Sequence, residues 1–156
     1  WYAKQCSEQK RRNCMEILKG AETSARIKED VKKMLDTLGG KIPKLAIVRV
    51  GERPDDVSYE RSAVKKLASF GLRAEAFSYP QEISHEDFKR EFKRINEDKD
   101  VDGILLLRPL PKQICEKDLE AMIDPGKDLD GISPVNVAKV FAGEGPEAAM
   151  VENYKT

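Results

Sequence analysis

The chain has 156 residues, a length that suits one domain with a hydrophobic core of its own. Lysine and arginine together number 28, as do aspartate and glutamate, so the zero net charge creates no field that would attract nucleic acid or an anionic membrane. Charged residues make up 36% of the chain and apolar residues 40%, which indicates a soluble folded domain and excludes a disordered tail.

Cysteine content and hydropathy bear on the cellular compartment. The three cysteines, Cys6, Cys14 and Cys115, have no CxxC spacing, so neither a disulfide framework nor a zinc site is expected. No apolar run approaches the roughly 20 residues that a membrane helix needs, and the polar residues 1–14 lack the apolar centre of a signal peptide. We therefore expect a cytoplasmic protein without a metal, in which residues 1–14 are an extension outside the fold.

A helix, a strand and a second helix are predicted in the first half of the chain. Apolar residues at helical spacing predict a helix from about Thr23 to a Gly-Gly pair that can end it. The next run, Leu45–Val50, is short and mostly apolar, as is typical of a parallel strand covered on both faces. A loop over 51–56 and a helix over about 57–70 complete a β-loop-α unit.

A second strand and a well-marked helix follow. The strand covers 73–78, and Pro80 ends it. Ser84 is placed to cap the following helix, and Ile83 and Phe88 occupy the two positions of a hydrophobic staple. We therefore expect this helix to begin at Ser84.

A third apolar strand over 104–107 leads into the stiff segment 108–111, which reads Arg-Pro-Leu-Pro. Helices that alternate with short apolar strands predict right-handed crossovers, and so an α/β fold with three layers, α/β/α, around a short parallel sheet. Ligands of such sheets bind beyond the carboxyl ends of the strands. The loops after Val50 and Leu107 are therefore expected to form the site.

Three segments end near that predicted edge, and they read VGERPDDVSYERSAVKKLASFGL, GILLLRPLPKQI and IDPGKDLDGISPVNVAKVFAG. Together with MEILKGAETSARI near the start of the chain, they resemble the methylenetetrahydrofolate dehydrogenase/cyclohydrolase family in both order and spacing. The resemblance implies that residues 15–143 form the family's folate-binding catalytic domain. It also implies an oxidoreductase of one-carbon metabolism with a tetrahydrofolate substrate.

The resemblance implies a folate site around Tyr59 and Asp130, both of which would be catalytic residues as well as substrate-binding ones. On the residues alone, Tyr59 could equally be a half-buried aromatic that packs on its own helix, and Asp130 a solvated turn residue. In the family the tyrosine lies against the folate and the aspartate binds the pterin, whose N–H groups a carboxylate can accept. Further substrate-binding residues are expected at Leu107, Arg108, Pro109, Leu110, Pro111 and Pro134.

Two departures from the family pattern bear on the chemistry. Bifunctional members carry a catalytic lysine where this chain has Ala63 and a glutamine where it has Leu107. Lys66 lies two helical turns from Tyr59, about 10 Å away, and does not replace the missing amine. Hydride transfer chiefly needs two aligned rings, whereas methenyl hydrolysis needs a positioned acid–base group. The resemblance therefore implies a dehydrogenase with weak or absent cyclohydrolase activity.

The family's nucleotide-binding domain is not recognisable in this chain. No GxGxxG motif occurs, and residues 144–156 resemble only the start of the connection to an NAD(P)-binding Rossmann domain. NADP or NAD is therefore expected to bind a domain outside this chain, which alone would be inactive, and the full-length protein is expected to be a homodimer. The alternative is a non-catalytic folate-binding or subunit-interaction module that kept the fold and lost the chemistry.

Overall fold

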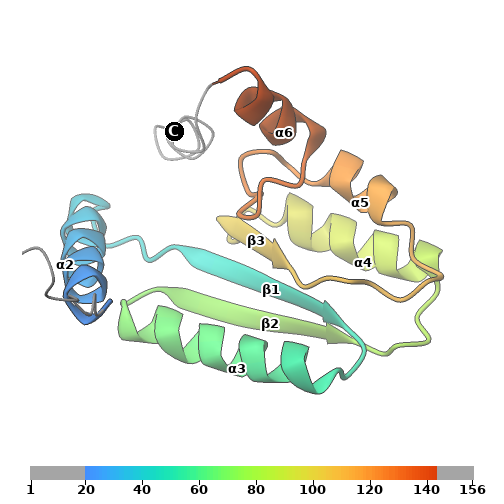
Figure 1. The fold of residues 1–156 in the computed structure, drawn as a ribbon, viewed down its shortest axis with the longest axis horizontal. Coiled ribbons are helices and arrows are strands. Elements are labelled where there is room, and N and C mark those ends of the chain that lie inside the picture. Colours follow the sequence, from blue (N-terminus) through green and yellow to red (C-terminus); the bar gives the residue numbers. More distant parts are fainter. Residues whose placement is uncertain (1–19, 144–156) are drawn as a thin grey trace, which may run out of the picture.

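The computed structural model describes residues 20–143 and shows a parallel sheet flanked by helices (Figure 1). The predicted extension over 1–14 and the predicted connection over 144–156 lie outside the described residues. Within the described part, none of the helices is long and apolar enough to cross a bilayer. The elements are, in chain order, α2 (Ala21–Thr37), β1 (Lys44–Val50), α3 (Pro54–Ser69), β2 (Arg73–Tyr79), α4 (His85–Glu97), β3 (Gly103–Leu106), α5 (Glu116–Met122) and α6 (Pro134–Phe141).

β1 is the central strand of a three-stranded sheet with the order β2-β1-β3, and both neighbours pair with it in parallel. Residues 46–50 are all buried, as expected of a strand covered on both faces. The chain moves from β1 out to β2 and then back past β1 to β3. Because parallel crossovers are right-handed, α3 and α4 cover opposite faces of the sheet. This arrangement confirms the predicted α/β fold with a short parallel sheet.

The main hydrophobic core lies between the sheet and the pair α4 and α5. Val48 and Val50 of β1 face this side, where the rings of Phe88 and Phe92 of α4 are fully buried. Deletion of any of these side chains would leave a cavity, so the core holds α4 firmly on this face. The other buried members of the core are Ala46, Ile95, Val101, Ile104, Leu106, Ile114, Leu119, Ile123 and Ile132.

Element boundaries differ from the sequence pattern at places that matter for the predicted site. The pattern predicts a helix from about Val57, whereas α3 begins at Pro54, whose fixed φ suits a first helical position. β3 ends at Leu106, so Leu107 lies just outside the strand, although its N–H still donates to Val48 O at 2.9 Å. The pattern also does not predict the helices α5 and α6, whose 7 and 8 residues are too few to display a clear helical period.

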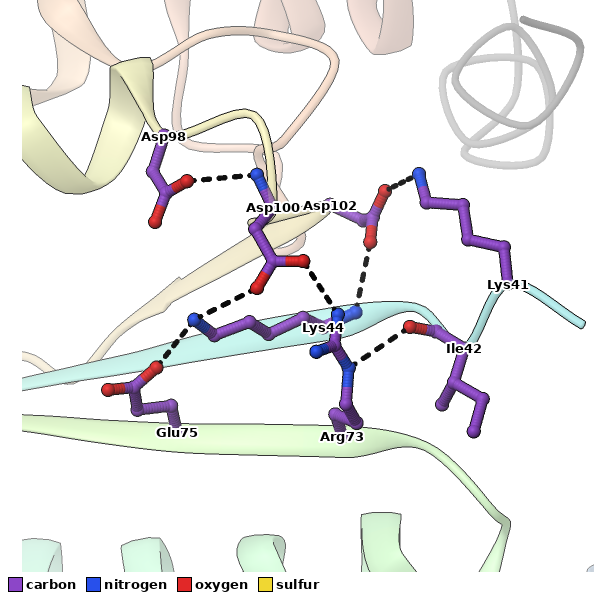
Figure 2. A network of polar contacts seen from close by, with 8 residues as sticks. All are labelled: Lys41, Ile42, Lys44, Arg73, Glu75, Asp98, Asp100 and Asp102. Atoms are coloured by element: carbon purple, nitrogen blue, oxygen red, sulfur yellow. Dashed lines mark hydrogen bonds and ion pairs between the residues drawn. The ribbon is translucent and has the colours of Figure 1, made fainter.

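Ion pairs join the three strands near their amino ends (Figure 2). Lys44 Nζ of β1 lies 2.6 Å from the carboxylate of Glu75 and 3.3 Å from that of Asp100. Arg73 of β2 donates to the same Asp100 at 2.8 Å. Asp102, which precedes β3, accepts the backbone N–H of Lys44 at 3.0 Å and donates its own N–H to Lys44 O at 2.8 Å. These contacts stabilise strand pairing at the edge opposite the predicted site.

Helix α4 has the predicted cap and staple. The side chain of Ser84 accepts the backbone N–H of Asp87 at 3.1 Å, as an N-cap residue should. Phe88 is fully buried and Ile83 packs against the same core, so the two staple positions are both apolar and in place.

Substitution of Ser84 by alanine is expected to lower the free energy of unfolding by about 1 kcal/mol, because the first turn of α4 loses its capping acceptor. Urea unfolding of the wild-type and variant proteins measures the change. Ser62→Ala is a suitable control, since Ser62 is an exposed serine inside α3 and caps nothing. A loss for Ser62→Ala as large as that for Ser84→Ala would contradict the assignment of the cap.

Candidate functional site

The loop over 124–133 is held beside β3 by backbone hydrogen bonds. The N–H of Ile104 donates to Lys127 O at 2.6 Å, and the N–H of Leu129 donates to Ile104 O at 3.3 Å. The loop therefore runs parallel to β3 for a short distance and continues toward the carboxyl edge of the sheet, where Asp130 follows. The segment that carries the predicted pterin-binding aspartate thus reaches the edge where the strand loops emerge.

Asp128 organises this loop from the inside. Asp128 is only 6% exposed. Its carboxylate accepts the N–H groups of Ile132 at 3.1 Å and Ser133 at 2.7 Å. It also accepts the side-chain amide of Asn136 at 3.0 Å. Ser133 in turn caps α6 by accepting the Asn136 N–H at 3.2 Å. With three donors satisfied inside the protein, Asp128 serves the structure of the loop.

Asp130 has the opposite environment two residues further on. It is exposed, and it makes no hydrogen bond to another described residue. The surrounding chain still removes water from the carboxylate, and this desolvation raises the pKa of Asp130. Arg108 opposes the rise, and the charge of Asp128 adds to it. Arg108 is therefore close enough to act on Asp130 electrostatically, although the two lie on different loops.

The segment that leaves β3 is attached to α5. The peptide bond between Arg108 and Pro109 is cis. The N–H of Leu110 donates to the Glu116 carboxylate at 3.0 Å, and the Arg108 guanidinium lies 3.8 Å from the carboxylate of Glu120. These contacts give the strand exit a defined path along the edge. Of the predicted wall residues, the half-buried ones are Leu107, Leu110 and Pro111 and the exposed ones are Arg108 and Pro109.

Tyr59 lies in the second turn of α3, just beyond the loop that follows β1. The residue is 55% exposed, so its ring is not packed in the core and is available to a ligand. Gly51 begins the loop with a φ of 86°, and a Cβ there would stand 2.9 Å from the side-chain oxygen of Gln81. Ala63 follows one helical turn after Tyr59 on the same face, about 6 Å along the axis, and is half-buried. Its methyl group carries no titratable function.

Pro134 is the predicted site residue with the least defined connection to the others. It is the first residue of α6, where it lines a shallow, mostly apolar surface with Val135 and Ala138 of the same helix and with Ala142, which follows the helix. No hydrogen bond links α6 directly to the strand exit in the described part of the chain. The side-chain amide of Asn136 in α6 instead donates to Asp128 and to the Pro125 carbonyl of the loop over 124–133, each at 3.0 Å. The role of Pro134 as a contact therefore remains a prediction.

A buried charged group that the sequence pattern does not anticipate lies beside Tyr59. Arg49 interrupts the apolar run of β1 and is only 8% exposed. Its Nε donates to Glu60 of α3 at 2.7 Å, and its Nη2 donates to Ser78 of β2 at 2.9 Å. The sequence did contain a signal for this pair, since Arg49 is a charged residue inside a strand predicted to be covered on both faces. Such a charge requires a partner on the covering helix.

The fold defines a class of protein, namely a parallel α/β domain, a class in which small-molecule sites lie at the carboxyl ends of the strands. Tyr59 of α3 and Asp130 are exposed, and both remain predicted site residues together with the strand exit after β3. Among residues 20–143, no group of three or more histidine, cysteine, aspartate or glutamate side chains is placed to hold a metal ion.

Comparison with known proteins identifies the family. Residues 18–130 match the model of the tetrahydrofolate dehydrogenase/cyclohydrolase catalytic domain. The chain is 43% identical over 131 residues to the bifunctional protein FolD of Alkaliphilus metalliredigens and 44% identical over 131 residues to that of Clostridioides difficile, covering 83% of this chain and 46% of each relative. The chain thus spans about half the length of the curated relatives it matches.

Solved structures agree with this assignment. The bifunctional FolD dehydrogenase/cyclohydrolase from Campylobacter jejuni superimposes with a TM-score of 0.78 at 31% identity, covering 83% of this chain and 47% of that one. The Trypanosoma brucei dehydrogenase-cyclohydrolase, solved with NADP and an inhibitor, gives a TM-score of 0.75 at 27% identity over 83% of this chain and 45% of that one. This chain belongs to the tetrahydrofolate dehydrogenase/cyclohydrolase family, of which it carries the catalytic domain.

The two aspartates of the loop should respond differently to removal of the carboxylate. Asp128→Ala is expected to lower the free energy of unfolding by about 3 kcal/mol or more, because three buried donors lose their acceptor. Asp130→Ala, which removes no hydrogen bond, should change it by less than about 0.5 kcal/mol. Urea unfolding of both variants tests the difference, and equal losses would contradict the division between a structural and an exposed aspartate.

Proposed function

We propose that this chain is the folate-binding catalytic domain of a methylenetetrahydrofolate dehydrogenase, which oxidises 5,10-methylenetetrahydrofolate to 5,10-methenyltetrahydrofolate with NAD or NADP. We further propose that its cyclohydrolase activity is weak or absent. The observation that carries both parts is the environment of Tyr59. The ring is exposed at the ligand edge of a domain of this family, while the residue one turn further on, Ala63, has no acid–base group.

The exposed groups at the edge suit a folate. The pterin is a flat ring system with adjacent N–H donors, and the Asp130 carboxylate, which accepts no hydrogen bond from another described residue, can accept two of them. The ring of Tyr59 offers a flat amphipathic surface to the pterin and aminobenzoyl groups. The strand exit over 107–111, which is attached to α5, supplies a wall of defined shape between them. A preorganised wall reduces the entropy that the ligand loses on binding.

The nicotinamide cofactor is assigned to a part of the protein outside this chain. The relatives are about twice as long as the chain, and one solved relative was crystallised with NADP. The residues described here would hold the folate, and the cofactor would supply the hydride acceptor. We propose that this chain alone is inactive, and that the full-length protein acts as a homodimer.

The lack of an acid–base group at Ala63 and Leu107 affects the family's two reactions differently. Hydride transfer from the one-carbon bridge requires the two rings to be held close and aligned, and no protein base is obligatory. Hydrolysis of the methenyl cation requires water to add and a proton to be moved. Ala63 and Leu107 provide neither an amine nor an amide for this work. Lys65 and Lys66 are exposed on other parts of α3, and Arg108 interacts with Glu120 and Asp130.

Asp130→Ala is expected to weaken the binding of a tetrahydrofolate analogue by about 1–3 kcal/mol, since the ring donors lose their acceptor in the bound state. Because the pKa of Asp130 is raised, the ionised acceptor is lost at a higher pH than an ordinary aspartate would require, and wild-type affinity should fall on mild acidification. Titration at several pH values measures both effects. Asp36→Ala on the exposed surface of α2 is the control, and equal affinities for wild type and Asp130→Ala would remove Asp130 from the site.

The full-length protein is expected to oxidise methylenetetrahydrofolate while methenyltetrahydrofolate hydrolysis stays near the uncatalysed rate. The combination of Ala63→Lys with Leu107→Gln should raise hydrolysis by up to about 10²–10⁴-fold, the usual contribution of acid–base assistance. Each single change should achieve less, because an unoriented lysine is a poor catalyst and a glutamine alone cannot move the proton. Loss of the methenyl absorbance over time measures the rate.

A lysine introduced at position 63 would have the Glu60 carboxylate as a neighbour. Glu60 lies three residues earlier on α3, within reach of a lysine introduced at position 63, and its carboxylate is already paired with Arg49.

Wild-type hydrolysis of methenyltetrahydrofolate as fast as methylenetetrahydrofolate oxidation would contradict the proposal. It would show that another cation, such as Arg108, supplies the acid–base assistance.

A further inference from the structure

Arg49 and Glu60 form a buried ion pair, and Glu60 is the residue that follows the predicted folate-binding Tyr59. The side chain of Arg49 is 10% exposed and that of Glu60 is 15% exposed, and their Nε and Oε2 atoms are 2.7 Å apart. Arg49 is the penultimate residue of β1, and Glu60 follows Tyr59 in α3. The pair therefore connects the carboxyl end of the central strand to the turn of α3 that carries Tyr59.

The guanidinium of Arg49 connects two further segments. One terminal nitrogen donates to the backbone carbonyl of Gly51 in the loop after β1, and the other donates to Ser78 Oγ of β2 at 2.9 Å. Ser78 Oγ also lies 3.3 Å from the Glu60 carboxylate, to which it donates. All three guanidinium nitrogens are thus engaged within the protein. The planar group leaves no nitrogen unpartnered for a ligand and holds four segments in a fixed relation.

Stability alone gives no reason for a charged pair at this place. Glu60 lies on the half-buried stripe of α3 that otherwise carries Val57, Val64 and Leu67, and Arg49 lies on the face of β1 that also carries the fully buried Ile47. An apolar pair at such positions is often as stable as an ion pair or more stable, because it has no charges to desolvate. The charged pair instead fixes the orientation of α3 relative to β1, because its hydrogen bonds are satisfied in one geometry only.

Helix α3 depends on this fixed orientation because its apolar packing is weak. It has no fully buried residue, whereas α4 buries Phe88, Phe92 and Ile95. A helix held by half-buried side chains can shift along or around its axis at little cost in packing. At the carboxyl edge of the sheet the Arg49–Glu60 pair bonds the helix to β1, so the pair limits such shifts where Tyr59 is attached.

We infer that Arg49 and Glu60 are positioning residues that hold the amino-terminal half of α3, and with it Tyr59, in place at the folate edge. The inference rests on the proposed function in so far as it assigns Tyr59 to a folate site. A displacement of about 1 Å at a binding group can reduce the rate up to about 10²-fold. The pair therefore acts on the substrate through Tyr59 without touching it.

The test compares two double variants of the full-length protein. Arg49→Met with Glu60→Met removes the pair and leaves no buried charge unpaired, so the protein should remain as stable as the wild type or become more stable. We expect kcat/KM for methylenetetrahydrofolate oxidation to fall about tenfold to a hundredfold. Lys44→Met with Glu75→Met removes an ion pair of similar length, 2.6 Å, at the opposite edge of the same sheet and should leave kcat/KM unchanged.

A double-mutant cycle with Tyr59→Ala identifies the cause. If the pair acts through Tyr59, the tyrosine substitution should cost clearly less in the Arg49→Met, Glu60→Met background than in the wild type. Additive losses, or equal losses for the two ion-pair variants, would overturn the inference.

Amide hydrogen exchange gives a readout that does not depend on folate. Exchange of the amides near Tyr59 should be faster in the Arg49→Met, Glu60→Met protein than in the Lys44→Met, Glu75→Met protein, because the first turns of α3 lose their hold on the sheet. Faster exchange in a protein whose wild type binds no folate would refute the proposed function and support the positioning role. Unchanged exchange would overturn the positioning role, whatever the protein binds.

Discussion

The burial of β1 on both faces is the constraint on which the rest of this structure depends. Ala46, Ile47 and Val48 have no exposed surface, so each edge of the strand needs a hydrogen-bonded neighbour and each face needs a cover. With right-handed crossovers, the order β2-β1-β3 then places α3 and α4 on opposite faces. Since all three strands run in one direction, their outgoing loops gather at a single edge. The position of the proposed ligand site follows from the burial of this strand.

The two edges of the sheet use charged residues in different ways. At the amino edge the ions are mostly exposed, and such pairs contribute little each in water. Burial alone would raise the pKa of Asp102, but the hydrogen bonds from Lys41 Nζ and from the Lys44 N–H outweigh it and lower the pKa. The stabilisation is therefore present at neutral pH and is lost only as the pH falls through the lowered pKa. At the carboxyl edge, Arg49 and Glu60 are buried. We infer that this pair fixes the position of α3 more than it contributes to the free energy of unfolding.

The loop after α5 places a buried aspartate and an exposed aspartate two residues apart. Asp128 is turned inward, where backbone and side-chain donors occupy its carboxylate, and it holds the loop and the start of α6 together. Asp130 is exposed, and its carboxylate accepts no hydrogen bond from another described residue. A similar division occurs on α3, where Tyr59 is exposed and its neighbour Glu60 is committed to Arg49. In both places an acid with partners inside the protein lies close in sequence to an exposed group.

The sequence by itself determined the types and order of the elements from α2 to β3, because helical and strand periodicity and the cap at Ser84 arise from residues close together in the chain. The family was also visible in local strings around Tyr59 and Asp130. The short helices α5 and α6, the inward turn of Asp128 and the partner of Arg49 were decided by the tertiary structure. Each depends on which side chain from a distant segment, or which backbone donor of the folded loop, lies within hydrogen-bonding distance once β1 is buried, and no local pattern encodes that distance.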